Sequence, residues 1–213
     1  NLESIHNICF HVVPDAEPVS ITLPPMRHGQ KHVEFPHKGH LFVISGPSGV
    51  GKGTICKRLI AECENVTVSV SATTRAPRSE DKEGVTYFFK TVDEFKSMVD
   101  NGRFLEWAIY NGNYYGTPIE AVDAKLSDGF DVILEIDAQG ALNVMNIRPD
   151  ARSVFIAPPD TETLYERLRG RGTESEEEIS RRVKAAQWEL DQKDKYKYIV
   201  INSTESINSS AGS

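Results

Sequence analysis

The chain has 213 residues, 39% of them hydrophobic and 26% charged, so it can bury a core without disulfide or metal staples. Its net charge of −7 argues against non-specific binding to nucleic acid or to an anionic membrane, although basic groups gathered at one site could still bind a polyanion. The three cysteines have no metal-ligand spacing, and neither a membrane span nor a signal peptide is visible. We therefore expect structural thiols, a cytoplasmic location, and no nucleic-acid or membrane partner.

Residues 1–38 differ in composition from the rest of the chain. They hold five of the six histidines and several prolines, and residues 8–13 and 19–23 could form short strands. The histidines suggest a metal site, but nearby proline and glycine residues prevent a shared helical face, and no carboxylate or cysteine completes a ligand set. We interpret 1–38 as an N-terminal extension of unknown role.

From Gly39 onward, strand-like and helix-like segments alternate. The expected strands are 41–45, 66–71, 85–90, 104–110, 132–136, 154–156 and 198–201. The expected helices are 53–64, 92–101, 118–128, 161–169 and 176–194. Short apolar runs between helices are typical of a parallel sheet covered on both faces, so the predicted fold class is α/β and doubly wound. Residues 203–213 are low in complexity and are expected to form a disordered tail.

The strongest motif is the run Gly46-Pro47-Ser48-Gly49-Val50-Gly51-Lys52, which follows an expected strand and opens an expected helix. This spacing and context are typical of a P-loop, whose backbone N–H groups and helix N-terminus bind phosphates while the lysine neutralises their charge. Gly53 replaces the usual serine or threonine, so Thr54 is the nearest hydroxyl and would reach Mg²⁺ only through water. The motif predicts binding of a nucleoside triphosphate with Mg²⁺ but not which reaction, because GTPases, motor ATPases and small-molecule kinases all share it.

A second group of residues suits a phosphate acceptor. Arg75 and Arg78 lie three residues apart beside several hydroxyls, and paired guanidinium groups bind phosphate well. Residues 84–89 and 112–117 add phenols, and Glu106 ends an apolar run. Each feature alone is ordinary, but together they match the needs of a nucleoside monophosphate.

Eight segments resemble those of guanylate kinases, in the same order and between Gly39 and Asn202: GPSGVGKGT, SATTRAPR, GVTYFF, FLEWA, GNYYGTP, ILEIDAQG, FIAPP and RLRGRGTESEEEISRR. The resemblance implies a P-loop NTPase-type parallel sheet, a GMP-binding insertion at about 71–129 and an arginine-rich lid at about 167–182. It also implies the reaction ATP + GMP = ADP + GDP with Mg²⁺.

The resemblance assigns roles to individual residues. Those implied to contact GMP are Ser71, Arg75, Arg78, Tyr87, Glu106, Tyr115, Thr117, Glu135 and Asp137. Residues 46–54 and Asn202 are implied to bind ATP, and Asp137 and Thr54 could reach the metal through water. The groups implied to act on the transferring phosphate are Lys52, Arg75, Arg167, Arg171 and Arg182.

The chemistry of the bases supports this assignment. A carboxylate at Glu106 can accept from the N1–H and N2–H groups of guanine, and a hydroxyl at Thr117 can donate to O6. Adenine reverses the order of donor and acceptor, which would leave Glu106 buried and unpaired.

Two alternatives remain open: a non-catalytic scaffold of the same fold, and a monophosphate kinase for AMP or UMP. The intact P-loop argues against the first, and Glu106 with Thr117 argues against the second. Residues 203–213 also lack the apolar stripe with which relatives usually end. The resemblance therefore predicts a truncated C-terminus and a melting temperature that rises when it is restored.

Overall fold

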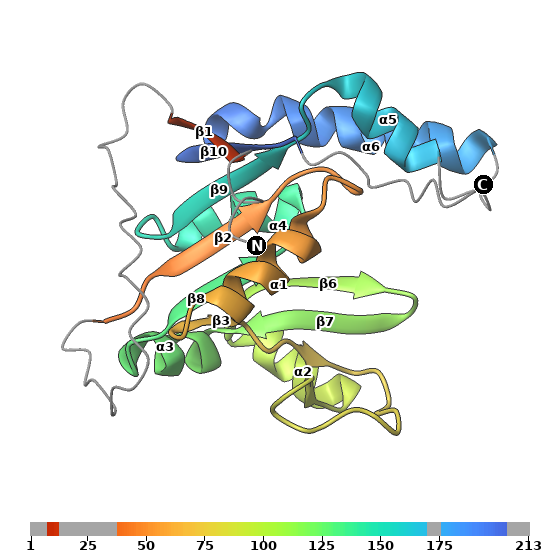
Figure 1. Ribbon diagram of the computed structural model, residues 1–213. Helices are drawn as coiled ribbons and strands as arrows, with labels where there is room; N and C mark the ends of the chain where they lie inside the picture. The colour runs from red at the N-terminus through yellow and green to blue at the C-terminus, as the bar shows by residue number, and fades with distance from the viewer. Residues whose placement is uncertain (1–7, 13–37, 170–175, 204–213) are drawn as a thin grey trace, which may run out of the picture.

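The computed structural model describes residues 8–12, 38–169 and 176–203 (Figure 1). Its centre is a six-stranded sheet in the order β1-β10-β9-β2-β8-β3. The strands are β1 (Ile8–Val12), β2 (Leu41–Ser45), β3 (Val66–Val68), β8 (Asp131–Glu135), β9 (Arg152–Ala157) and β10 (Tyr198–Asn202). All neighbours run parallel except β1, which pairs antiparallel with β10 at one edge.

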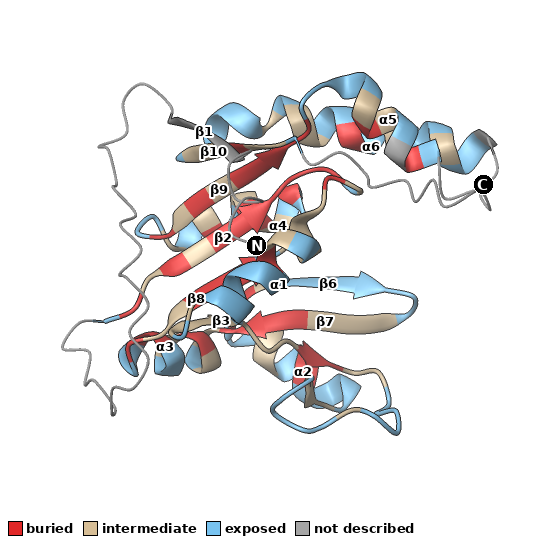
Figure 2. Ribbon diagram, in the orientation of Figure 1, coloured by how far each residue is buried: buried red, intermediate tan, exposed pale blue. Residues whose placement is uncertain are grey.

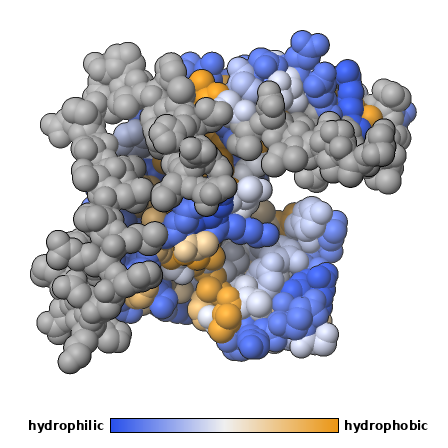
Figure 3. Space-filling model, in the orientation of Figure 1, coloured by the Kyte–Doolittle hydropathy of each residue, from blue (hydrophilic) through white to orange (hydrophobic). Residues whose placement is uncertain are grey.

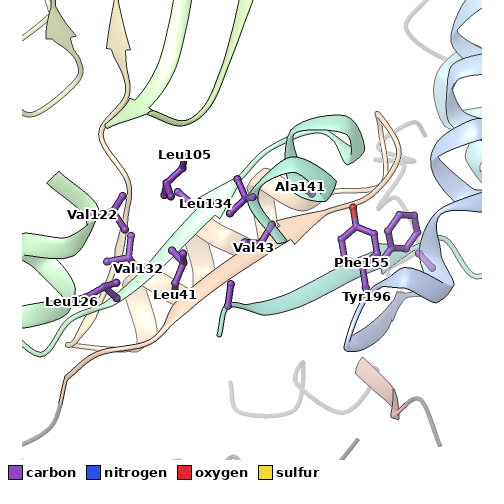
Figure 4. Packing of buried hydrophobic residues seen from close by; sticks show 13 residues of the cluster. Leu41, Val43, Leu105, Val122, Leu126, Val132, Leu134, Ala141, Phe155 and Tyr196 are labelled. Carbon is purple, nitrogen blue, oxygen red and sulfur yellow. The ribbon is translucent and has the colours of Figure 1, made fainter. Parts of the chain in front are cut away.

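Helices cover both faces of this sheet because alternate side chains of its central strands point to opposite sides. Val43 packs into a core cluster with residues of α3 (Ile119–Ser127) and α4 (Ala138–Ile147), as Figure 4 shows. The next residue, Ile44, packs on the other face with Cys56 of α1 (Lys52–Glu62). The buried residues therefore run along the sheet between two helical layers (Figure 2). The predicted α/β class with a mainly parallel sheet is confirmed.

A second, four-stranded sheet has the order β5-β4-β7-β6. It consists of β4 (Ala72–Thr73), β5 (Phe88–Phe89), β6 (Phe104–Tyr110) and β7 (Asn113–Pro118). Helix α2 (Val92–Asp100) begins with a capping box between Thr91 and Glu94, and it buries Phe95 against Phe104 with ring centroids 4.4 Å apart.

Helices α5 (Thr161–Arg169) and α6 (Glu176–Asp191) pack together through Leu164, Leu168 and Ala186. Figure 3 shows a hollow in the surface next to the part that carries β6 and β7. Among the described helices, none has the length and apolar character needed to cross a membrane.

Several expected elements differ from those observed. The predicted strand at 85–90 shrinks to Phe88–Phe89 because Val85 and Thr86 form a turn through backbone hydrogen bonds to Lys82. The strand expected at 66–71 ends at Val68. Strand β7 and helix α4 were not expected at all.

The remaining expected elements are found with ends that move by a few residues, and the short strand expected at 8–13 is β1. The possible strand at 19–23 and the tail after residue 203 lie outside the described residues. The division into an extension, a kinase domain and a tail stays a prediction.

Candidate active site

The P-loop joins the carboxyl end of β2 to α1 through backbone angles that favour glycine. Gly46 has φ 144°, and a Cβ atom there would lie 2.2 Å from the carbonyl oxygen of Ile156. Gly51 has φ 96° and caps the N-terminus of α1. The helix therefore starts with its free N–H groups beside the loop, an arrangement that attracts anions.

Lys52, the first residue of α1, turns its ammonium group back into the loop. Its Nζ donates to the carbonyl oxygen of Gly46 and, at 3.2 Å, to that of Pro47. Burial lowers the pKa of Lys52, while nearby carboxylates, Glu189 first among them, oppose this shift. The loop thus carries a cation that is partly removed from solvent, where its charge acts strongly.

Helix α6 lies beside the P-loop and brings two charged side chains to it. Nη2 of Arg182 is 3.5 Å from the hydroxyl oxygen of Ser48. Glu189 lies roughly two turns further along the same helix face. Burial raises the pKa of its carboxyl group, and the charge of Lys52 and hydrogen bonding from the backbone N–H groups of Ser48 and Ala138 partly offset this.

Two of the predicted catalytic arginines are not placed. Residues 170–175, which include Arg171, and the side chain of Arg167 lie outside the described part of the chain. Their roles stay predictions.

Asn202 connects β10 to the P-loop. Its Nδ2 donates to the carbonyl oxygen of Val50 at 2.8 Å, and a Cβ atom on Gly51 would lie 2.6 Å from the same nitrogen. The sequence placed Asn202 near ATP, and in the structure its side chain supports the backbone of the loop.

The acceptor residues predicted from separate segments come together on the second sheet. The guanidinium carbon of Arg75 lies 5.3 Å from the ring centroid of Tyr87 and 5.9 Å from that of Phe89. The rings of Tyr87 and Tyr115 are 6.0 Å apart. Arg75 also donates from Nη2 to the Asp81 carboxylate at 2.8 Å. One cation and two phenols therefore share a small region, as binding of a phosphate would require.

Ser71 and Arg78 flank this group. Ser71 is half-buried just before β4, and its carbonyl oxygen accepts a hydrogen bond from the backbone N–H of Phe88 at 2.9 Å. Arg78 is exposed in the loop that follows β4. Their predicted contacts with GMP stay predictions.

A β-bulge positions Glu106. Strand β6 pairs with β7 through Phe104 and Pro118 and again through Trp107 and Gly116, so two residues of β6 face one residue of β7. The single residue is Thr117. Thr117 is only 1% exposed, and its hydroxyl donates to Oε1 of Glu106 at 2.7 Å.

The environment of Glu106 is unusual for a carboxylate. Burial raises its pKa, the Thr117 hydroxyl lowers it, and Asp137 raises it further. Glu106 also approaches the other half of the site, because a Cβ atom on Gly140 of α4 would lie 3.8 Å from Glu106 Cγ and 3.4 Å from Asp137 Oδ1. A partly desolvated carboxylate of this kind suits recognition of N–H donors.

Glu135 and Asp137 lie at the carboxyl end of β8, where ligands of open α/β sheets bind. Asp137 caps α4 by accepting from Gly140 N at 2.7 Å. Glu135 faces the first turn of α1, and a Cβ atom on Gly53 would lie 3.4 Å from its Oε1. Burial, and to a lesser extent the negative charge of Glu135, raises the pKa of the Cys56 thiol to about 11. The thiol therefore stays protonated and unreactive near neutral pH.

The residues around the loop fit an Mg²⁺ ion that is held mainly by phosphate and water. Within the described ranges, no cluster of three or more His, Cys, Asp and Glu side chains could hold a metal ion. Mg²⁺ in nucleotide sites usually retains several waters and phosphate oxygens, so such a cluster is not needed. Glu135, Asp137 and the exposed Thr54 beside the loop suit contacts through water.

Sequence reasoning missed two residues of the site. Asp81 contacts Arg75, and its only signal in the sequence was an acidic residue shortly after two arginines. Glu189 lies on α6 among several other glutamates, and nothing in its local sequence marked it as a neighbour of the P-loop.

Comparison with known proteins accounts for these features together. The family model described as guanylate kinase matches residues 38–209. A guanylate kinase of Caldanaerobacter subterraneus subsp. tengcongensis is 53% identical over 165 residues, which are 78% of this chain and 80% of the relative. One of Bacillus subtilis is 49% identical over 166 residues, 78% of this chain and 81% of the relative.

A solved structure supports the same conclusion. The crystal structure of guanylate kinase from Anaplasma phagocytophilum matches with a TM-score of 0.54 and 34% identity, covering 79% of each chain. On this sequence similarity and the shared fold, the chain belongs to the guanylate kinase family.

Proposed function

We propose that the chain transfers the γ-phosphoryl group of ATP to GMP and releases ADP and GDP. The observation that carries this proposal is the bulged β6–β7 pair, which brings the partly buried Glu106 side chain next to Gly140 of α4 and near Asp137. Such a group binds the N1–H and N2–H donors of guanine and disfavours adenine, which presents an acceptor at the equivalent ring nitrogen.

The Thr117 hydroxyl, expected from the sequence to donate to O6 of guanine, also has a partner within the protein. Its proton is directed to Glu106. In this arrangement Thr117 orients the carboxylate, and a hydrogen bond to O6 would require the hydroxyl to rotate.

The transfer itself needs alignment and charge neutralisation more than a covalent nucleophile. A phosphate oxygen of GMP attacks the γ-phosphorus, and the bond to the β-phosphate oxygen of ATP breaks. Lys52 would move from the carbonyl oxygens of the loop to the phosphates, and Arg75 would hold the acceptor. Mg²⁺, when bound to ATP, would neutralise charge on the phosphates.

The test is ADP formation by the purified chain with ATP and Mg²⁺ in the presence of GMP, AMP or UMP. We expect turnover that depends on GMP and is far slower with the other acceptors. Absence of turnover with GMP would contradict the proposal and favour a non-catalytic scaffold. Equal rates with AMP would contradict the assigned role of Glu106.

A cytoplasmic location, where both nucleotides are available, belongs to the same proposal.

A further inference from the structure

Of the ion pairs in the described part of the chain, the one between Arg75 and Asp81, beside the second sheet, is the most enclosed. The side chains are 16% and 8% exposed, and Nη2 of Arg75 lies 2.8 Å from Oδ2 of Asp81. The mechanism uses Arg75 but gives no role to Asp81. An enclosed carboxylate next to an expected phosphate site therefore needs an explanation.

Asp81 ties together the loop that follows β4. The same oxygen, Oδ2, accepts from Nη2 of Arg75 and from the backbone N–H of Arg78, both at 2.8 Å. Nη1 of Arg75 donates to the carbonyl oxygen of Ala76, also at 2.8 Å. Because Tyr87 flanks the guanidinium plane as well, the long arginine side chain is fixed on several sides.

The fixed guanidinium still has capacity for a ligand. Of its five N–H donors, the hydrogen bonds to Asp81 and Ala76 use one on Nη2 and one on Nη1. The others can bind phosphate oxygens beside the Tyr87 and Tyr115 phenols. A guanidinium held in place before binding loses less freedom when the phosphate arrives.

Charge alone predicts the opposite role for Asp81. Its hydrogen bonds, with that from Arg78 N–H contributing most, lower the pKa of the carboxyl, so it stays negative at neutral pH. A negative group close to a phosphate dianion weakens binding unless it serves another purpose. Removing the charge should therefore improve GMP binding if Asp81 acts only through its field, and should impair it if Asp81 orients Arg75.

We propose that Asp81 is a positioning residue that holds Arg75 in the orientation required by the phosphate of GMP. This inference rests on the proposed function and concerns the acceptor site alone.

The first test compares Asp81→Asn with Glu80→Gln. Glu80 is the exposed neighbour in the same loop and accepts from the Ser79 hydroxyl at 3.0 Å, so its substitution removes an equal charge without taking a partner from Arg75. We expect Asp81→Asn to raise the KM for GMP about 10- to 100-fold, with the KM for ATP and the melting temperature nearly unchanged. Glu80→Gln should leave both KM values close to those of the parent. A lower or unchanged KM for GMP in Asp81→Asn would overturn the proposal.

A double-mutant cycle tests whether Asp81 acts through Arg75. In an Arg75→Ala background, Asp81→Asn should change the Kd for GMP by less than about 2-fold. Additive effects of the two substitutions would refute a role through Arg75. Asp81→Glu, which retains the charge and can reach the guanidinium, should recover part of the lost GMP affinity. No recovery would count against the proposal.

The parent enzyme separates the two levels of inference. If the parent does not turn over GMP, the proposed function fails and the positioning role fails with it. If the parent is active and Asp81→Asn behaves like Glu80→Gln, only the positioning role fails.

Discussion

The two halves of the site are built in different ways. The P-loop is made largely of backbone, from one contiguous run of residues whose glycines adopt positive φ angles, which allow N–H groups to turn toward a phosphate. The acceptor half is made of side chains from separate segments in and beside the second sheet, where Arg75 meets Tyr87 and Thr117 meets Glu106 only after folding. The first kind of site takes most of its phosphate-facing groups from one run of backbone, whereas the second depends on register and on neighbouring side chains. Substitutions in each half can test this contrast, beginning with the largest expected effect.

Lys52→Met should give the largest loss. Removing a cation that stabilises the transferring phosphate is expected to lower kcat by about 100- to 1,000-fold. Because burial lowers the pKa of Lys52, the charged form is disfavoured in the fold, so the methionine variant should be at least as stable as the parent near neutral pH. A coupled ADP assay and thermal unfolding measure both effects.

Lys57→Met is the matched control, because Lys57 is exposed on the same helix. It should leave kcat unchanged. Equal losses in the two variants would show that the effect comes from α1 as a whole and not from the loop.

Glu106→Gln should lower kcat/KM for GMP by about 10- to 100-fold and have much less effect on the slow reaction with AMP. The same measurement on Glu64→Gln, an exposed glutamate, is the control. A variant that still prefers GMP as strongly as the parent would break the link between the bulge and base recognition.

The pH dependence of Glu106 follows from its environment. Its pKa is raised mainly by burial. As the pH falls, protonation removes the hydrogen-bond acceptor, so the KM for GMP should begin to rise at a higher pH than it would for a glutamate with the ordinary pKa. The folded state disfavours the charged form, so Glu106 costs stability as the pH rises from its unfolded pKa through the raised folded value. Glu106→Gln should lose this acid limb and be no less stable at neutral pH. An acid limb that persists in the variant would assign it to another group.

Gly46→Ala should destabilise the P-loop itself. A Cβ atom would meet the carbonyl oxygen of Ile156 at 2.2 Å, in addition to the cost of a positive φ. Gly102→Ala is the control, because Gly102 also has positive φ but nothing within 4 Å of the added atom. We expect Gly46→Ala to lose roughly 1–3 kcal/mol more than Gly102→Ala in urea unfolding. Equal losses would mean that the loop yields without cost.

Asn202→Ala should have the smallest effect. It removes the donor to the Val50 carbonyl oxygen, worth about 1 kcal/mol, and should raise the KM for ATP a few-fold while the KM for GMP stays constant. Asn101→Ala removes a similar bond at the end of α2, to Ser97, and should change neither value. An effect of Asn202→Ala on GMP alone would contradict its place beside the P-loop.

The same contrast explains what the sequence could predict. The run 46–52 carries its own geometry, so the loop and the strand before it were predicted correctly. The acceptor residues were noticed by their chemistry and received their roles from the resemblance, because no local pattern indicates a bulge between Phe104 and Trp107. Strand β7 was missed because it contains Gly116 and ends at Pro118, and both residue types are typical of turns. In the structure Gly116 lets β7 lie close to β6, because a Cβ atom there would be only 2.9 Å from the Cβ atom of Trp107.

Helix α4 was missed for a related reason. Its sequence, AQGALNVMNI, follows an apolar strand almost without a break and contains Gly140, so neither a polar face nor a clear start was visible. Only the cap supplied by Asp137 marks its beginning. Contacts between distant segments, such as that of Arg182 on α6 with Ser48 of the P-loop, depend on the folded arrangement and leave no periodic trace in the chain.

The most direct test of this division of labour is calorimetric titration of Lys52→Met and Glu106→Gln, each with GMP and separately with a non-hydrolysable ATP analogue. We predict a crossed result, in which Lys52→Met weakens binding of the analogue and keeps that of GMP, while Glu106→Gln does the reverse. Loss of both ligands in either variant would contradict this division, because it would show that the two halves do not hold their nucleotides independently.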